Sequence, residues 1–244
     1  ENLPVMLALT GIWNINFLGL KAHTILPYDG RLKLLPNYLS QLEMESNGKS
    51  VTNAGERVDF DTSPVIWGDV GANAQHAFFQ LLHQGTPAYY ADFIVPLRRK
   101  ASREYTQATR NQLEYQQALN LANCVAQSRV LMLGDEVLTW EQSLAASPDR
   151  LYPGNHASST LMFDELTPES LGQLIALYEH KVFVQAVVWD INPFDQWGVE
   201  LGKQIAKTTL SAIQNRRAGL GSPEDTKFDA STEGLLNHVF RHHT

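Results

Sequence analysis

The chain has 244 residues and a formal net charge of −7, from 19 Lys and Arg against 26 Asp and Glu. This length allows one large domain or two small ones, and 43% hydrophobic residues are too many for a disordered chain. The acidic balance argues against a general nucleic-acid-binding protein. The single cysteine, Cys124, excludes an internal disulfide framework and a multi-cysteine zinc site, and it fits a reducing cytoplasm.

The first residues are apolar, but we do not expect them to be a signal peptide. The chain begins without an initiator methionine and without the basic region of a secretory signal peptide. Asn14, Asn16 and two glycines interrupt the apolar run at 3–20, so a membrane span is a poor interpretation. The pattern instead predicts a helix that begins near Pro4, is apolar on nearly all sides and is covered all round by a sheet and other helices. We expect the chain to be a piece of a longer protein.

The rest of the chain alternates short apolar runs with longer helical patterns. Strands are predicted at 24–27, 65–68, 88–95 and 160–163. Helices are predicted at 32–44, 74–84, 108–133, 136–146, 167–189 and 195–217, and a short helix at 232–241 follows a linker at 219–229. Asn73 and Thr167 are the expected caps of the helices that follow them. Short strands separated by helices predict an α/β three-layer sandwich with a mostly parallel sheet, in which ligands gather at the carboxyl ends of the strands.

Taken singly, the candidate functional side chains have ordinary explanations. Glu45 precedes a loop-forming Ser-Asn-Gly and is a candidate base, but a solvated surface glutamate has the same surroundings. His76 and His83 are too far apart for the one-turn spacing of a zinc helix, and metal binding is a weak hypothesis. We expect one of them to be a buried histidine, while the other is a candidate for proton transfer.

Three other polar sites also have ordinary explanations. Lys203 is typical of an exposed helical lysine, and Cys124 of an inert buried thiol. Glu-His-Lys at 179–181 looks like a polar interruption of an apolar helix.

Four segments of the chain resemble one known family. The segment 192–203, Asn-Pro-Phe-Asp-Gln-Trp-Gly-Val-Glu-Leu-Gly-Lys, closely resembles the C-terminal signature of the phosphoglucose isomerases. Met-Glu-Ser-Asn-Gly-Lys at 44–49, Ala-Gln-His-Ala-Phe at 74–78 and Leu-Tyr-Glu-His-Lys at 177–181 are similar to three other segments of that family. The resemblance runs along essentially the whole chain, but it covers only the C-terminal half of the family's sequence.

The resemblance implies roles for five residues. Glu45 would carry a proton between C2 and C1 of the open-chain sugar phosphate. His76 and Lys203 would open the sugar ring by proton transfer, and in the family this histidine comes from the neighbouring subunit. Gln41 and Gln196 match glutamines that contact the substrate. The implied reaction interconverts glucose 6-phosphate and fructose 6-phosphate through an enediolate, without a metal or redox cofactor.

The resemblance also implies an organisation and a setting. A flavodoxin-like sugar isomerase domain would occupy 1–218, and a linker with a C-terminal arm helix would occupy 219–244. The parent enzyme would be a cytoplasmic homodimer that acts on sugar phosphates and binds neither nucleic acid nor membrane. The chain alone is expected to be inactive or nearly so, because it lacks the phosphate-binding half that orients the sugar.

Two loops depart from the family's pattern, and two other functions remain open. Gly-Ala-Asn-Ala at 71–74 stands where the family commonly has Gly-Thr-Asn-Gly, and Gly-Asn-His-Ala at 154–157 where it has Gly-Asn-Arg-Pro. The second change replaces a guanidinium with an imidazole and removes a rigid proline. The alternatives are a sugar-phosphate-binding or regulatory module without turnover and a subunit-interaction domain.

Overall fold

The structure is a computed structural model, and it describes residues 2–100, 102, 104–138, 147–218 and 228–241. The chain forms two compact units, Glu1–Phe194 and Asp195–Thr244. The domain boundary predicted after residue 218 lies further along the chain and stays a prediction. Most of the predicted helix at 136–146 and of the predicted linker at 219–229 lies outside the described residues. The described start of that helix is a 3-10 turn, Gly134–Val137.

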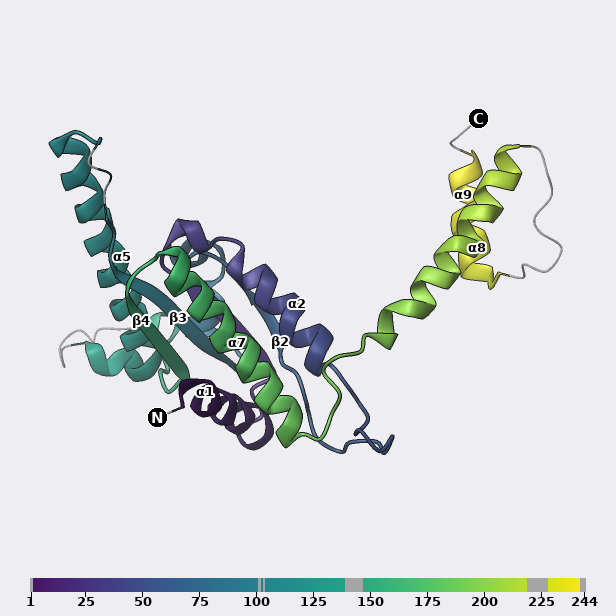
Figure 1. Cartoon of the computed structure of the whole chain (residues 1–244), viewed down its shortest axis with the longest axis horizontal. Helices are drawn as coiled ribbons and strands as arrows, with labels where there is room; N and C mark the ends of the chain where they lie inside the picture. Colours follow the sequence, from purple (N-terminus) through teal and green to yellow (C-terminus); the bar gives the residue numbers. More distant parts are fainter. Residues whose placement is uncertain (1, 101, 103, 139–146, 219–227, 242–244) are drawn as a thin grey trace. The chain divides into compact units, whose positions relative to one another are not determined.

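A parallel sheet is the centre of the first unit (Figure 1). Its strands run in the order β2-β1-β3-β4, and their bounds are β1 Ala22–Pro27, β2 Val65–Gly68, β3 Tyr89–Arg98 and β4 Ser158–Glu165. All three strand pairs are parallel, and Ala22 of β1 pairs with both Val65 and Tyr89. This order matches the flavodoxin-like arrangement, so the predicted α/β fold class is confirmed.

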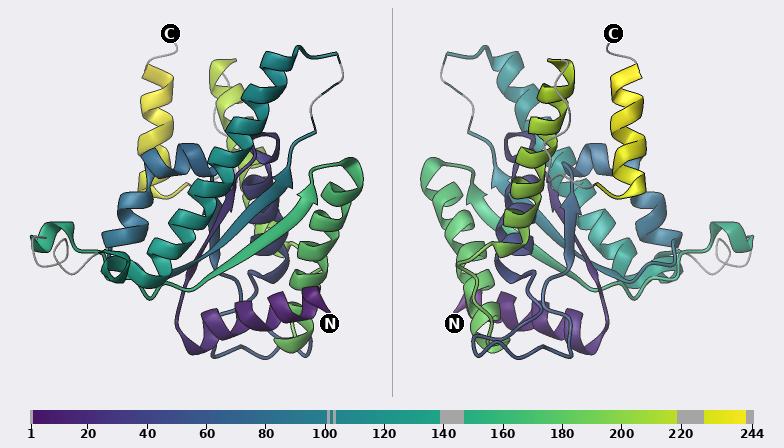
Figure 2. Two further views of the ribbon diagram at one scale, coloured as in Figure 1. Left: turned by 90° about the vertical axis from the view of Figure 1, so that its left-hand side faces the viewer. Right: turned by 90° about the vertical axis from the view of Figure 1, so that its right-hand side faces the viewer.

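Helices cover both faces of the sheet, as Figure 2 shows for α5 and α7. One face carries α1 (Leu3–Ile12), α2 (Leu35–Asn47) and α7 (Pro168–Val188), and the other carries α3 (Gly71–Ala77), α4 (Phe79–Gln84) and α5 (Gln107–Leu133). Successive strand residues point to opposite faces. Ile25 and Ile94 therefore belong to the core under α2 and α7, whereas Leu26 and Phe93 belong to the core under α4 and α5.

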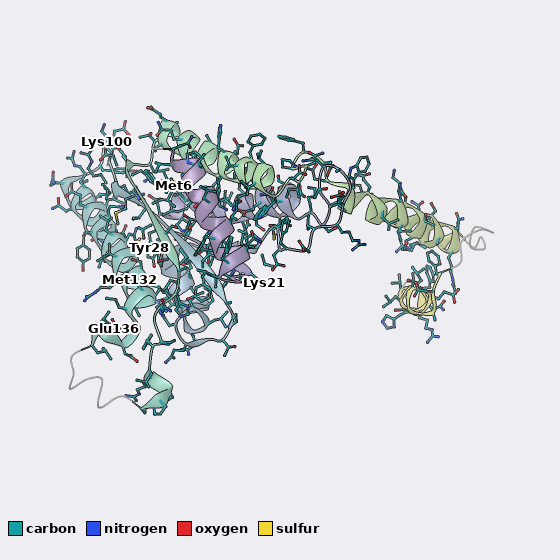
Figure 3. The ribbon with its side chains drawn as sticks, turned by 90° about the horizontal axis from the view of Figure 1, so that it is seen from below. Met6, Lys21, Tyr28, Lys100, Met132 and Glu136 are labelled. Carbon is teal, nitrogen blue, oxygen red and sulfur yellow. The ribbon has the colours of Figure 1, made fainter. Side chains whose placement is uncertain are left out.

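The helix predicted at 74–84 is divided in two at Phe78. The backbone of Phe78, at φ −147° and ψ 3°, leaves the helical region between α3 and α4. Helix α3 already begins at Gly71, so Asn73 lies inside it and the predicted cap is wrong; Val70 occupies the N-cap. Gly71 allows a close approach, because a Cβ there would lie 2.3 Å from the ring of Tyr28, which is labelled in Figure 3.

The first helix is less covered than the sequence predicts. Helix α1 ends at Ile12 and continues as a π-helical turn, Trp13–Phe17. Its buried residues pack toward α7, but Met6, which Figure 3 labels, is 57% exposed. Leu9 and Trp13 are exposed on the same side of the helix, by 47% and 56%. The prediction of cover on all sides is wrong for the described residues.

Helices α5 and α7 agree with the sequence prediction to within one residue at each end, whereas α2 runs on to Asn47, past its predicted end at 44, and so contains Glu45. Thr167 and Ser170 form a capping box at the start of α7, with each side chain accepting the other's backbone N–H at 3.1 and 2.8 Å. In the second unit, a 3-10 turn, Trp197–Val199, precedes α8 (Glu200–Arg217), so this helix begins later than predicted. Helix α9 (Ala230–Arg241) contacts α8 within the same unit. In the first unit, further 3-10 turns occupy Gly30–Leu32 and Pro148–Arg150.

Candidate active site

Gln41 and Glu45 lie on one exposed face of α2. Residues four apart differ by about 40° around a helix axis, so these two side chains are neighbours. The exposure of Glu45 is that of an ordinary surface glutamate, and it also leaves the carboxylate open to a small molecule. A paired amide and carboxylate can bind sugar hydroxyls and accept a proton.

The opposite face of the same helix end is anchored in the interior. Glu43 and Asn47 are each about 200° around the axis from Glu45. Lys181 Nζ of α7 donates to Glu43 Oε2 at 2.5 Å, and the side chains of Lys181 and Glu43 are 1% and 2% exposed. Asn47 Nδ2 donates to the carbonyl of the next residue of α7, Val182, at 3.1 Å. The α2 turns that carry Glu45 are thus held to α7 from behind.

A lysine caps the end of α2. Lys49 Nζ donates to the backbone carbonyls of Glu45 and Ser46 at 2.7 and 2.8 Å. A cation is favourable there, because the last carbonyls of a helix have no partners within the helix and carry partial negative charge. The Met-Glu-Ser-Asn-Gly-Lys segment therefore holds both the candidate base and the cap of its helix.

A second buried polar group lies at the centre of the sheet. His23 Nε2 of β1 is 3.0 Å from Asp92 Oδ2 of β3, and Tyr178 OH of α7 donates to the same oxygen at 2.9 Å. Burial alone raises the pKa of the Asp92 carboxyl, but His23, Lys181 and Tyr178 outweigh it and hold that pKa below its usual value. Burial and the Asp92 charge raise the pKa of Tyr178 well above its ordinary value. Asp92 is therefore a buried carboxylate, with the neutral phenol of Tyr178 donating to it.

The two histidines differ as the sequence predicts. His83 is buried on α4, with Nε2 at 2.8 Å from Gln127 Oε1, and burial lowers the pKa of its imidazole. His76 is exposed on α3, and its role in proton transfer stays a prediction.

Within the first unit, Glu45 and His76 lie at opposite ends of the sheet. Helix α2 follows the carboxyl end of β1 and runs back, so its last turn reaches the amino ends of the strands. There Ser63 Oγ, just before β2, contacts the carbonyl of Glu43 at 3.5 Å. Helix α3 begins beyond the carboxyl end of β2. One copy of this unit does not bring the carboxylate and the imidazole together.

Gln196 and Lys203 lie in the second unit. Gln196 is exposed and directly precedes the turn at Trp197–Val199. Lys203 is on the first turns of α8, and its Nζ donates to Glu200 Oε1 at 2.7 Å, an exposed pair three residues apart. The five candidate residues are thus distributed over both units, three in the first and two in the second.

The one cysteine of the chain is a buried residue of α5. Cys124 is buried under the sheet, and burial raises the pKa of its thiol to about 12, as expected for an inert thiol. Among the described residues, no cluster of three His, Cys, Asp or Glu side chains is placed to hold a metal ion. None of the described helices has the length and apolar character that crossing a bilayer requires.

The loop at 154–157, which departs from the family pattern, is turned by two residues with positive φ. Gly154 and Asn155 have φ of 65° and 56°. The next residue, His156, stacks on the ring of Tyr89 with centroids 5.0 Å apart. Burial and the nearby His83 lower the pKa of the His156 imidazole. This imidazole therefore packs against the first residue of β3, where burial disfavours its charged form.

Sequence reasoning missed the buried partners behind Glu45. Lys181 looked like part of a polar interruption, but it lies on the buried stripe of α7 with Leu174, Tyr178 and Gln185. The spacing of these four positions, 174, 178, 181 and 185, is that of one helix face. That spacing was the signal available in the sequence.

The fold and these residues define a class of protein, a parallel α/β domain with carboxylate, imidazole and amine groups suited to proton transfer. A family model described as phosphoglucose isomerase matches residues 1–236. The chain belongs to the phosphoglucose isomerase family, as the sequence motifs predict.

Individual relatives support the same family. The chain is 60% identical over 242 residues to glucose-6-phosphate isomerase 2 of Chromohalobacter salexigens, covering 99% of this chain and 42% of that protein. It is 54% identical to the glucose-6-phosphate isomerase of Psychrobacter cryohalolentis, covering 98% and 42%. The crystal structure of a Chlamydia trachomatis glucose-6-phosphate isomerase matches 100% of this chain and 42% of its own, with a TM-score of 0.76 and 36% identity. The chain therefore spans less than half the length of the curated relatives it matches.

Proposed function

We propose that this chain is the C-terminal part of a glucose-6-phosphate isomerase and carries most of its proton-transfer groups. The observation that carries the proposal is the pair Gln41 and Glu45, exposed side by side on a helix end that is anchored from behind. The names of the relatives supply one substrate, glucose 6-phosphate, and the family resemblance of the sequence implies fructose 6-phosphate as the other.

In the proposed reaction, Glu45 is the base. It takes the C2 proton of the open-chain aldose, and the electron pair left behind forms the enediolate. The same carboxyl group returns the proton to C1, while the O2 hydroxyl proton moves to O1, which gives the ketose. A carboxylate can do this only while an electrophile polarises the adjacent carbonyl. No group of this chain is assigned that task, so we propose that the remainder of the enzyme supplies it.

His76 and Lys203 are the proposed ring-opening pair. Opening the pyranose requires one group that protonates the ring oxygen and another that accepts the proton of the anomeric hydroxyl. Imidazole changes charge near neutral pH and suits either task, and an amine or an ordered water completes the pair. We propose that His76 acts in the site of a second subunit in a homodimer, and its placement at the far end of the sheet from Glu45 supports this arrangement.

A chimera tests the proposal. In it, this chain replaces the matching part of the Chromohalobacter isomerase, and a coupled assay measures the conversion of fructose 6-phosphate. We expect the chimera to be active and the 244-residue chain alone to be inactive or nearly so, because binding through the substrate phosphate orients the sugar. A turnover-free binding module predicts that the chimera binds fructose 6-phosphate without converting it.

Substitution of the base sharpens the test. Glu45→Gln keeps the shape of the side chain and removes its basicity, so kcat should fall by about 10²–10⁴ while fructose 6-phosphate still binds. Glu114→Gln, at an exposed glutamate of α5, is the matched control and should retain full activity. An active Glu45→Gln chimera contradicts the assignment, and full activity of the chain alone contradicts its incompleteness.

A further inference from the structure

The ion pair of Glu43 and Lys181 is sealed where three helices meet. Glu43 comes from α2 and Lys181 from α7, and their charged atoms are 2.5 Å apart. Helix α1 closes over the lysine at Gly11, where a Cβ would lie 3.6 Å from Lys181 Cε and 2.5 Å from Gln185 Nε2. A larger residue at 11 would push α1 away, so the glycine allows the cover that excludes water from the pair.

Stability alone does not account for a pair in this place. Taking two charges out of water costs much of what their attraction returns, and apolar residues of similar volume often replace such pairs without loss of stability. A charge-assisted hydrogen bond adds direction, because it is strong only at a short distance and a narrow angle. The Glu43–Lys181 pair therefore holds α2 at one orientation about its axis. Apolar side chains at these two positions would allow a wider range of orientations.

A second contact makes this orientation unique. Asn47 lies one turn beyond Glu43 on the same face of α2 and donates to the carbonyl of Val182, the residue after Lys181. Two anchors one turn apart fix the helix end both in rotation and along its axis. The two anchored residues flank Glu45 in the sequence and lie on the opposite face of the helix.

Small rotations of α2 have large effects at Glu45. A side-chain tip lies about 6 Å from a helix axis, so a rotation of about 10° moves it by about 1 Å. A displacement of that size can cost about 10²-fold in a reaction that depends on near-attack geometry.

We propose that Glu43 and Lys181 are positioning residues for Glu45, with Asn47 as their second anchor. The buried pair sets the rotation of α2 and so the place of the Glu45 carboxylate relative to the substrate carbon. This inference rests on the proposed function of Glu45 as the base.

The test compares single and double variants in the chimera. Lys181→Met leaves the Glu43 charge buried without a partner, so both the melting temperature and kcat should fall. Glu43→Gln with Lys181→Met removes both charges, so the melting temperature should recover toward that of the parent. The double variant still lacks the directional hydrogen bond between residues 43 and 181. Its kcat per folded site should therefore stay at least tenfold below that of the parent chimera, while KM changes less than threefold. Lys21→Met, which removes an exposed pair with Asp61 at 3.2 Å, is the control and should change neither.

The outcomes separate this inference from the proposed function. If kcat recovers together with the melting temperature in the double variant, the pair is only structural and the inference is overturned. Asn47→Ala removes one hydrogen bond and leaves the ion pair in place, so it covers the case in which the charge variants do not fold. It should lower kcat at least threefold, and an unchanged kcat overturns the inference. If instead Glu45→Gln is fully active, the proposed function itself fails.

Discussion

At the scale of single residues, the Asp92 carboxylate is a buried charge held by three partners. It lies at the centre of the sheet, and its stabilising partners come from a strand and a helix far away in sequence, His23 on β1 and Tyr178 and Lys181 on α7. A carboxylate held in this way contributes to stability only while it is ionised, so its partners make the fold sensitive to acid.

We expect the stability of the first unit to fall in acid because of Asp92. Its pKa in the folded chain is below the value of about 3.9 that an unfolded chain has. Its contribution is therefore complete above that value and is lost as the pH falls through the folded pKa. Asp92→Asn should cost about 3–5 kcal/mol at pH 7, because it leaves buried partners unmatched. Urea unfolding between pH 7 and pH 3 measures both effects.

The same titration contains its own control. The variant should lose less stability than the parent between pH 5 and pH 3, since it no longer has this carboxyl to protonate. Asp59→Asn, at an exposed aspartate outside the helices and strands, should follow the parent chain at every pH. Parallel curves for the parent and Asp92→Asn would contradict the assignment.

At the scale of elements, close backbone contacts decide where helices lie. Helix α3, which carries His76, begins where Gly71 touches the Tyr28 ring after β1. That ring also stacks on Phe93 of β3, with centroids 6.1 Å apart, so it cannot move aside easily.

Gly71→Ala should destabilise the chain by about 1–3 kcal/mol, because the new methyl group overlaps the Tyr28 ring. Gly172→Ala is the matched control. This glycine lies inside α7 with nothing within 4 Å of its Cβ position, so alanine should stabilise the helix by up to about 1 kcal/mol. Thermal unfolding compares the two. Equal melting temperatures would show that α3 is not held at this contact.

The elements also show which parts of the fold a single sequence predicts. The strand at Val65–Gly68 was predicted with both bounds, because a short apolar run bounded by turn residues has few other structures. The helix break at Phe78 was not predicted, because it accompanies a contact between residues distant in the sequence. The Phe78 ring packs on the ring of Trp67, with centroids 4.4 Å apart. Glu45 was singled out as a candidate base from the loop-forming residues after it, whereas Gln41 was found only through the family resemblance. The helical spacing could have shown that Lys181 is buried, but its pairing with Glu43 spans 138 residues, and no local pattern records such a pairing.

At the scale of the whole molecule, the uncovered side of α1 is the main departure from the predicted core. Met6, Leu9 and Trp13 leave an apolar stripe on this helix, while its other side packs toward α7. Apolar surface of this kind lowers the solubility of a chain studied alone.

Met6→Lys together with Leu9→Glu should raise the solubility of the 244-residue chain without lowering its melting temperature, because neither side chain is buried. Precipitation by polyethylene glycol and thermal unfolding are the two measurements. Ile12→Lys, on the buried side of α1, is the contrasting variant. It should weaken the packing of α1 on its neighbours and lower the melting temperature. A lower melting temperature in the double variant would show that the stripe is covered.

The seal over Lys181 has a chemical consequence. An amine-reactive acylating reagent should modify the exposed Lys21 within the first moments, but it can reach Lys181 only when α1, α2 and α7 separate. Mass spectrometry of the peptide that contains Lys181 measures how fast the label accumulates there. That rate gives the rate at which this three-helix junction opens in the native protein. The acylation rate of Lys181, which lies behind the proposed base, thus reports how often the junction of α1, α2 and α7 opens.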